Sequence, residues 1–206
     1  FLTPVDAVRT PKSTGPGSGA RDGATMRVGS RGEPGASLLA LEVAAACAEG
    51  RARSAAAADA ILCACWRYRD HPLAESEDDA IGAIAVGAAP LRGVEVVPTE
   101  LALLLRLEEL TKTLDPDVLL GWDAARESWG YVVARAKALR LAYFDQRLSR
   151  DAALPPKRTF FGGEFRGRTL VGGWCAVRGD DQLTSLLNAD LPAVLRHVLG
   201  EALPAY

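Results

Sequence analysis

Four cysteines are the residues whose type and spacing could carry metal or redox chemistry in this sequence: Cys47, Cys63, Cys65 and Cys175. Such a set could form disulfides or hold a zinc ion. Cys63 and Cys65 form a C-x-C pair inside an apolar run, whereas zinc knuckles use C-x2-C pairs, and no second pair follows. The spacing therefore favours free, buried thiols of an intracellular protein.

The remaining reactive residues do not indicate a catalytic nucleophile or a phosphate-binding loop. Ser128 has no histidine base near it in sequence, and its place before a helical run is typical of an N-cap. His71 lies in an acidic stretch and His197 in a helical one, so both are interpreted as surface or packing residues. The glycine pairs at 162–163 and 172–173 are not followed by the Lys and Ser or Thr of a phosphate loop.

Trp122 and Trp129 are the residues that could bind single-stranded DNA, because a base can stack on an indole ring. Core packing around the neighbouring apolar strand is the favoured interpretation of both. The formal net charge of −2 provides no general attraction to nucleic acid. Any basic DNA-binding surface would have to be local or lie elsewhere in a parent protein.

Length and composition predict one domain with a tail. The chain has 206 residues, of which 49% are apolar and 24% charged, as in ordinary soluble proteins. Residues 1–35 are rich in Gly, Ser, Pro, Thr and Arg and are predicted to be a disordered tail or linker. Residues 36–206 would form the domain. We expect no membrane span and no signal peptide, and the first residue, Phe1, favours a segment of a larger protein.

Hydrophobic periodicity predicts the elements that position these residues. Short apolar or alternating runs predict strands at residues 37–47, 59–67, 81–86, 94–97, 118–121 and 169–177. Helical spacing appears at residues 99–114, 128–141 and 188–199, with a loop at 146–168. Thr99 is the expected N-cap of the first helix, and Asp115-Pro116 its stop. Strands followed by alternating helices and strands predict an α/β domain with a mixed sheet.

One segment leads beyond a general α/β domain. Residues 114–123 read LDPDVLLGWD, and residues 128–131 read SWGY. A strand, a glycine, a short loop and a new helix in this order resemble the second exonuclease motif of family B DNA polymerases. The SWGY version is similar to the zeta, or translesion, branch of that family.

Other segments resemble the same branch in the same order. Leu39–Val43 falls where the family has its first exonuclease motif, Phe-Asp-Ile-Glu. Leu148-Ser149-Arg150 and the stretch from Gly167-Arg168 onward fit the pattern downstream. The resemblance covers residues 36–206, and it implies a ribonuclease H-like fold, with a mixed sheet flanked by helices.

The resemblance also implies what an exonuclease site would need. In that family, four acidic residues hold two divalent ions, which lie about 4 Å apart and repel each other by roughly 16 kcal/mol at an effective dielectric of about 20. Glu42 keeps one of these carboxylates, but Ala40 and Ser128 stand at the Asp positions of the first and second motifs. Asp123 stands where the motif has Asn, and a third motif would lie beyond Tyr206.

These replacements predict an exonuclease-like domain that is catalytically inactive and acts as a scaffold and DNA-channel wall. No polymerase motif occurs in the segment, so the parent, a nuclear translesion polymerase with Mg²⁺ and accessory subunits, would carry out nucleotidyl transfer. The segment itself is expected to have no cofactor. The alternatives are a weakly active, metal-dependent 3′–5′ exonuclease that uses Glu42 and Asp123, and a binding module with no DNA role.

Overall fold

The computed structural model describes residues 35–49, 54–70, 79–90, 92–151, 165–179 and 191–200. The chain divides into two units, residues 1–34 and 35–206. The first unit, and with it nearly all of the predicted tail, lies outside the described residues. Within the described residues, no helix has the length and apolar character needed to cross a membrane.

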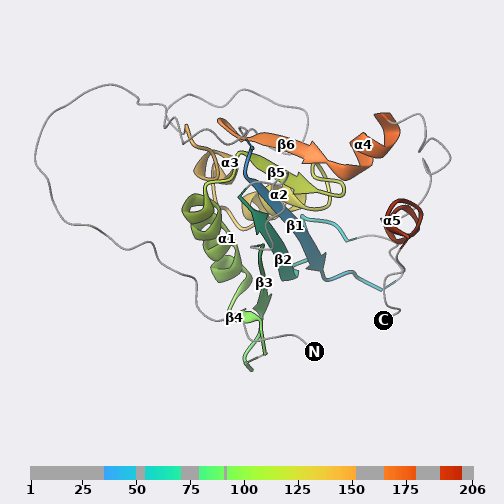
Figure 1. Ribbon diagram of the computed structural model, residues 1–206. Coiled ribbons are helices and arrows are strands. Elements are labelled where there is room, and N and C mark those ends of the chain that lie inside the picture. The colour runs from blue at the N-terminus through green and yellow to red at the C-terminus, as the bar shows by residue number, and fades with distance from the viewer. Residues whose placement is uncertain are drawn as a thin grey trace, which may run out of the picture. The chain divides into compact units, whose positions relative to one another are not determined.

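The second unit is an α/β domain built on a mixed, six-stranded sheet (Figure 1). The strands are β1 (Leu38–Ala45), β2 (Ile61–Arg69), β3 (Ala80–Val86), β4 (Glu95–Val97), β5 (Val118–Gly121) and β6 (Thr169–Gly172). Their order across the sheet is β4-β3-β2-β1-β5-β6. β2 pairs antiparallel with both β1 and β3, whereas β3–β4, β1–β5 and β5–β6 are parallel pairs.

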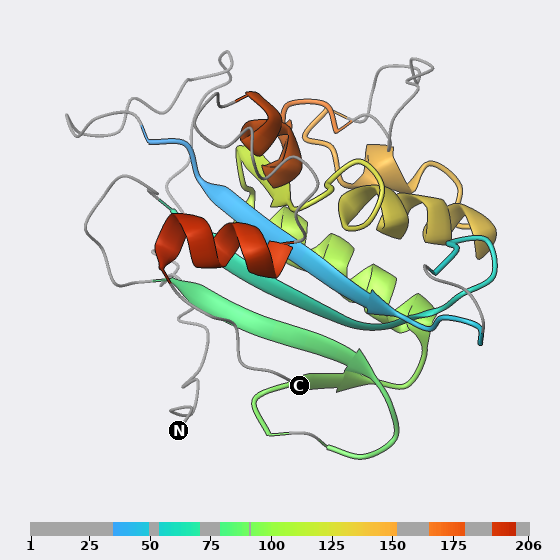
Figure 2. The same ribbon diagram turned by 90° about the vertical axis from the view of Figure 1, so that its right-hand side faces the viewer.

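Helices flank this sheet. They are α1 (Glu100–Leu114), α2 (Trp129–Ala138), α3 (Phe144–Arg147), α4 (Gly173–Gly179) and α5 (Leu191–Leu199). Figures 1 and 2 show α1, α2 and α3 on one side of the sheet and α5 on the other. The predicted mixed α/β architecture is therefore confirmed.

The main core lies between the sheet and α1 and α2. Alternate strand residues such as Leu39, Leu41 and Ile84 face it, together with Leu103 and Leu107 of α1. The leucine spacing in α1 places one apolar stripe against the sheet. The predicted caps of this helix are confirmed: the Thr99 hydroxyl accepts from the Ala102 amide, and Asp115 ends the helix in the left-handed conformation.

Two predicted elements are corrected. The strand expected at residues 169–177 ends at Gly172, and residues from Gly173 onward form α4. β6 can extend only as far as its neighbour offers backbone partners, and β5 ends at Gly121, which pairs with Gly172. The loop expected at 146–168 begins only after Arg147, because α3 extends to that residue and packs its buried Phe144 into the core. Residues 152–164 of this loop lie outside the described part. The third predicted helix is confirmed for 191–199, and residues 188–190 are not described.

Candidate functional site

The residues of the two exonuclease-like motifs meet at one edge of the sheet. β1 and β5 are parallel neighbours, with Ala40 opposite Leu120, so their carboxyl ends lie side by side. Glu42 lies near the end of β1, and Trp122 and Asp123 directly follow β5. The Trp122 amide donates a hydrogen bond to Oε1 of Glu42 at 2.5 Å, which joins the two motifs directly.

Three carboxylates interact at this edge. Glu42 is exposed as a residue, yet partial removal of its carboxyl from water raises its pKa, and the charges of Glu127 and Asp123 raise it further. The Trp122 amide opposes this rise by hydrogen bonding to the ionised form. The structure thus brings Glu42, Asp123 and Glu127 within electrostatic reach of one another.

Ala40 lies on the same face of β1 as Glu42, because residues two apart on a strand share a face. Its antiparallel partner on β2 is Arg67. Arg67 and Arg69 both bind Asp79, whose pKa is lowered to about 2, chiefly by the hydrogen bond from Arg69. The position that resembles the first-motif Asp therefore holds a methyl group, and its cross-strand neighbour is cationic.

Ser128 occupies the N-cap position of α2, but its side chain makes no capping hydrogen bond. The prediction that capping explains this serine is therefore wrong. The side chain is fully buried, and its hydroxyl has no partner among the described residues. It packs so tightly against β5 that a Cβ built on Gly121 would lie 1.9 Å from the hydroxyl oxygen.

Replacing Ser128 by alanine is expected to raise the free energy of unfolding by about 1 kcal/mol, because a buried hydroxyl without a partner carries a desolvation penalty. Urea unfolding of the two proteins measures the change. Ser149→Ala is the matched control, since the Ser149 hydroxyl donates to the Asp145 carbonyl and accepts from the Arg166 amide. That control should lower stability; a loss of similar size in Ser128→Ala would contradict the prediction.

Trp122 and Trp129, for which core packing was favoured over base stacking, differ in accessibility. Trp129 is fully buried, its Nε1 donates to the Leu120 carbonyl at 2.9 Å, and its ring meets Phe165 edge-on. Trp122 is half-buried and meets Trp174 edge-on. Only Trp122 therefore presents part of its ring to solvent.

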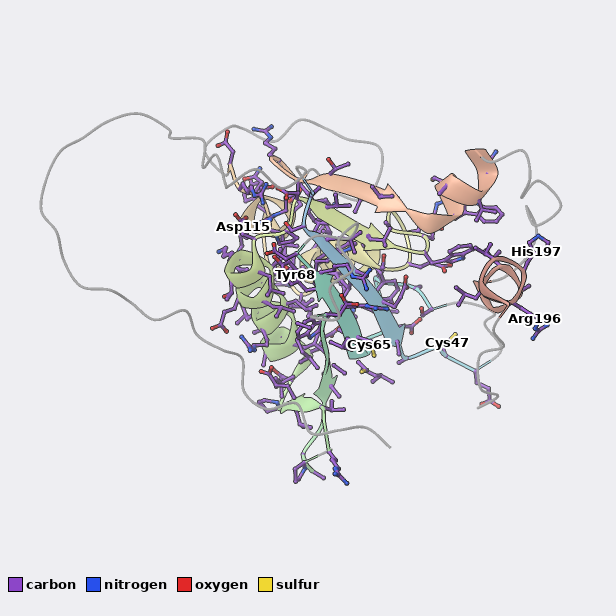
Figure 3. The ribbon with its side chains drawn as sticks, in the orientation of Figure 1. Cys47, Cys65, Tyr68, Asp115, Arg196 and His197 are labelled. Atoms are coloured by element: carbon purple, nitrogen blue, oxygen red, sulfur yellow. The ribbon has the colours of Figure 1, made fainter. Side chains whose placement is uncertain are left out.

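A network of aspartates and arginines lies at the other end of the same strands, just before the amino-terminal ends of β1, β5 and β6. This network was not predicted from the sequence. Arg150 donates to Asp115 Oδ1 at 2.8 Å and to Asp117 Oδ1 at 2.6 Å, and the buried Arg168 side chain also contacts Asp115. Asp117 in turn binds the amide and hydroxyl of Ser37 ahead of β1. Figure 3 shows Asp115 at the end of α1.

Electrostatics hold this network in its charged form. Burial works to raise the pKa values of Asp115 and Asp117, but favourable interactions outweigh it and lower both pKa values. These interactions come from Arg150 and Arg168 at Asp115, and from Arg150 and Ser37 at Asp117. Gly167 permits the close packing, because it has a φ of +74° and a Cβ there would lie 2.9 Å from Cβ of Arg150. The network therefore joins the LDPD, Leu-Ser-Arg and Gly-Arg segments. The opposite charges of the aspartates in LDPD and the arginines in the other two segments are the sequence feature that could have predicted it.

The four cysteines form no disulfide bond, as predicted, but the prediction that they are buried is wrong. Cys47, Cys65 and Cys175 are exposed, and Cys63 is half-buried. β2 has apolar residues on both faces, but α1 covers only the face that carries Ala64 and Trp66. His197 lies exposed on α5, as Figure 3 shows, and His71 is outside the described residues.

The residues at the β1–β5 edge do not fit a two-metal nuclease site. Within the described ranges, no three Asp, Glu, His or Cys side chains are placed to hold one metal ion. The Glu42 carboxylate is engaged by a backbone amide, and Ala40 and Ser128 offer no negative charge. The arrangement can accept hydrogen bonds and shape a surface, but it lacks the clustered charge that two divalent ions require.

The structure defines an α/β protein with a mixed sheet, and this architecture is compatible with a ribonuclease H-like domain. No protein-family model matches the chain. The chain is similar to the DNA polymerase zeta catalytic subunit of Schizosaccharomyces pombe, with 28% identity over 192 residues. It is also similar to the DNA polymerase zeta catalytic subunit of Mus musculus, with 29% identity over 130 residues.

These matches cover much of the chain but little of the relatives. The first spans 82% of this chain and 12% of the Schizosaccharomyces pombe protein, and the second spans 56% of this chain and 4% of the Mus musculus protein. The chain is thus a segment related to the polymerase zeta catalytic subunit, and the predicted relationship to that branch is confirmed.

Proposed function

We propose that this chain is the exonuclease-like segment of a zeta-type translesion DNA polymerase, with a ribonuclease H-like fold and no nuclease activity. In this role it serves as a scaffold and as part of the wall of the DNA channel. The parent would act in the nucleus with Mg²⁺ and accessory subunits. The mixed sheet with flanking helices supports the fold, because the resemblance implies that architecture.

This proposal rests mainly on the small number of carboxylates at the motif positions of the β1–β5 edge. Among the described residues of this edge, Glu42 alone keeps both an acidic side chain and its place in the resembling motifs, and its carboxylate accepts a hydrogen bond from the Trp122 amide. At the two positions that would complete the site, Ala40 faces Arg67 and Ser128 is buried under β5. Two divalent ions that repel by roughly 16 kcal/mol need more negative charge than this edge provides.

A second candidate, a weak metal-dependent exonuclease, is favoured by one observation. Asp123 and Glu127 both raise the pKa of Glu42, so negative charge does gather at this edge. A single Mn²⁺ or Mg²⁺ ion could reduce that repulsion. This candidate predicts cleavage that is slow and depends on Glu42.

A labelled single-stranded oligonucleotide separates the two candidates. The unmodified chain, incubated with Mg²⁺ or Mn²⁺, is expected to leave the oligonucleotide at full length, and Ala40→Asp should not change this result. That variant restores one carboxylate next to Arg67, whereas Ser128 still supplies no charge. A chain extended to include the third motif, carrying both Ala40→Asp and Ser128→Asp, tests whether activity can be restored.

Two acid-to-amide variants are the controls for that assay. Cleavage by the unmodified chain that is abolished by Glu42→Gln and retained by Glu109→Gln would overturn the proposed inactivity and support the second candidate. Glu109 is a suitable match because it lies on the exposed side of α1. Cleavage that survives Glu42→Gln would be assigned to a contaminating nuclease.

A further inference from the structure

Cys63 and Cys65 of β2 form a close pair of thiols. Their Sγ atoms are 3.9 Å apart, close enough for one thiol to donate to the other. Cys65 is exposed and Cys63 half-buried, and neither forms a disulfide. Figure 3 shows Cys65 on β2, on the side of the sheet that faces away from α1.

The separation of the two sulfur atoms suits a tetrahedral metal ion. With Zn–S bonds of about 2.3 Å, sulfur atoms 3.9 Å apart subtend an angle of about 116° at the ion, close to the tetrahedral value. We propose that Cys63 and Cys65 form a two-thiolate binding site for a soft, thiophilic ion of the Zn²⁺ class. Water would complete the coordination, because the exposed Cys65 opens the site to solvent.

The site is independent of the proposed polymerase role and differs in chemistry from a nuclease centre. Glu42 is the cross-strand partner of Cys65 on the same face, but its carboxylate is bound to the Trp122 amide. Two sulfur ligands therefore define the site, and soft thiolates select Zn²⁺, Cd²⁺ or Cu⁺ over Mg²⁺. This preference separates it from the hard-ion chemistry of clustered carboxylates.

Ion binding must displace protons from these thiols. A thiol binds a metal ion as its thiolate, so each sulfur that coordinates the ion releases its proton to solvent.

Cadmium titration of the reduced chain tests the proposal, because a thiolate–Cd²⁺ charge-transfer band reports sulfur coordination directly. One Cd²⁺ per chain is expected to bind, and Zn²⁺ should displace it. Cys63→Ser or Cys65→Ser should weaken binding roughly a hundredfold, since each removes one of only two protein ligands. Cys175→Ser, at an exposed cysteine on α4, should leave binding unchanged.

A dithiol reagent provides a test that needs no variant. Phenylarsine oxide binds pairs of neighbouring thiols, so one molecule should bind per unmodified chain and abolish the cadmium band. The proposal is overturned if the single variants bind Cd²⁺ as tightly as the unmodified chain, or if binding is lost in Cys175→Ser. Failure of the folded, reduced chain to take up the arsenical overturns it equally.

Discussion

Replacing Trp129 by alanine is expected to lower the free energy of unfolding by about 3–5 kcal/mol, the range for truncating a large buried aromatic side chain. The change removes a fully buried indole, its hydrogen bond to the Leu120 carbonyl and its edge-on contact with Phe165. It also leaves that carbonyl, at the end of the motif-bearing strand, without this donor. Urea unfolding of the unmodified and variant chains measures the loss.

Trp122→Ala is the matched control for that experiment. Trp122 is half-buried, so its removal should lower stability by only about 1–2 kcal/mol. The comparison also separates packing from base stacking. If Trp129→Ala weakened binding of a single-stranded oligonucleotide while leaving stability unchanged, the packing role assigned to Trp129 would be wrong.

Arg135→Ala is expected to lower the free energy of unfolding by about 3–5 kcal/mol, because it leaves an almost buried carboxylate without its counter-charge. Arg135 binds Glu100 through two hydrogen bonds of 2.6 and 2.9 Å, and both side chains are only 11% exposed. The guanidinium also donates to the Ala56 carbonyl, and Glu100 accepts from the Ile61 amide. The pair therefore ties α1 and α2 to the start of β2.

Arg106→Ala removes a salt bridge of the same type at the surface and serves as the control. Arg106 binds Glu95 and Glu109, and all three side chains are at least 34% exposed, so the expected loss is below about 1 kcal/mol. The double variant Glu100→Gln with Arg135→Met should recover part of the loss seen in Arg135→Ala. Equal losses at Arg106 and Arg135 would contradict the role assigned to burial.

The sequence alone determined the presence and order of the six strands and of α1, α2 and α5, but not of α3 and α4. The leucine spacing of residues 99–114 defined α1, and the expected cap at Thr99 forms in the structure. The strand at 118–121 and the helix after Ser128 also followed from local pattern. These features are encoded locally, because hydrophobic period and capping act over a few residues.

The local hydrophobic pattern could not determine where β6 ends or whether the cysteines are buried. β6 ends at Gly172 because β5, its partner, ends at Gly121, and this pairing joins residues far apart in the chain. Cys63 and Cys65 lie in an apolar run that resembles a buried strand, but helices α1–α3 lie on only one face of the sheet. The partners of a strand and the cover on each face are properties of the assembled sheet.

The candidate site shows the same division. The sequence placed neutral residues at Ala40 and Ser128 and retained Glu42, which predicted an incomplete acidic site. Only the tertiary structure showed that Glu42 binds the Trp122 amide and that Arg67 lies opposite Ala40. It also showed that the Ser128 hydroxyl is buried with no hydrogen-bond partner in the described part of the chain. The physical reason is that residue type fixes the available charge, whereas burial and hydrogen-bond partners come from segments about 80 residues apart that pack together.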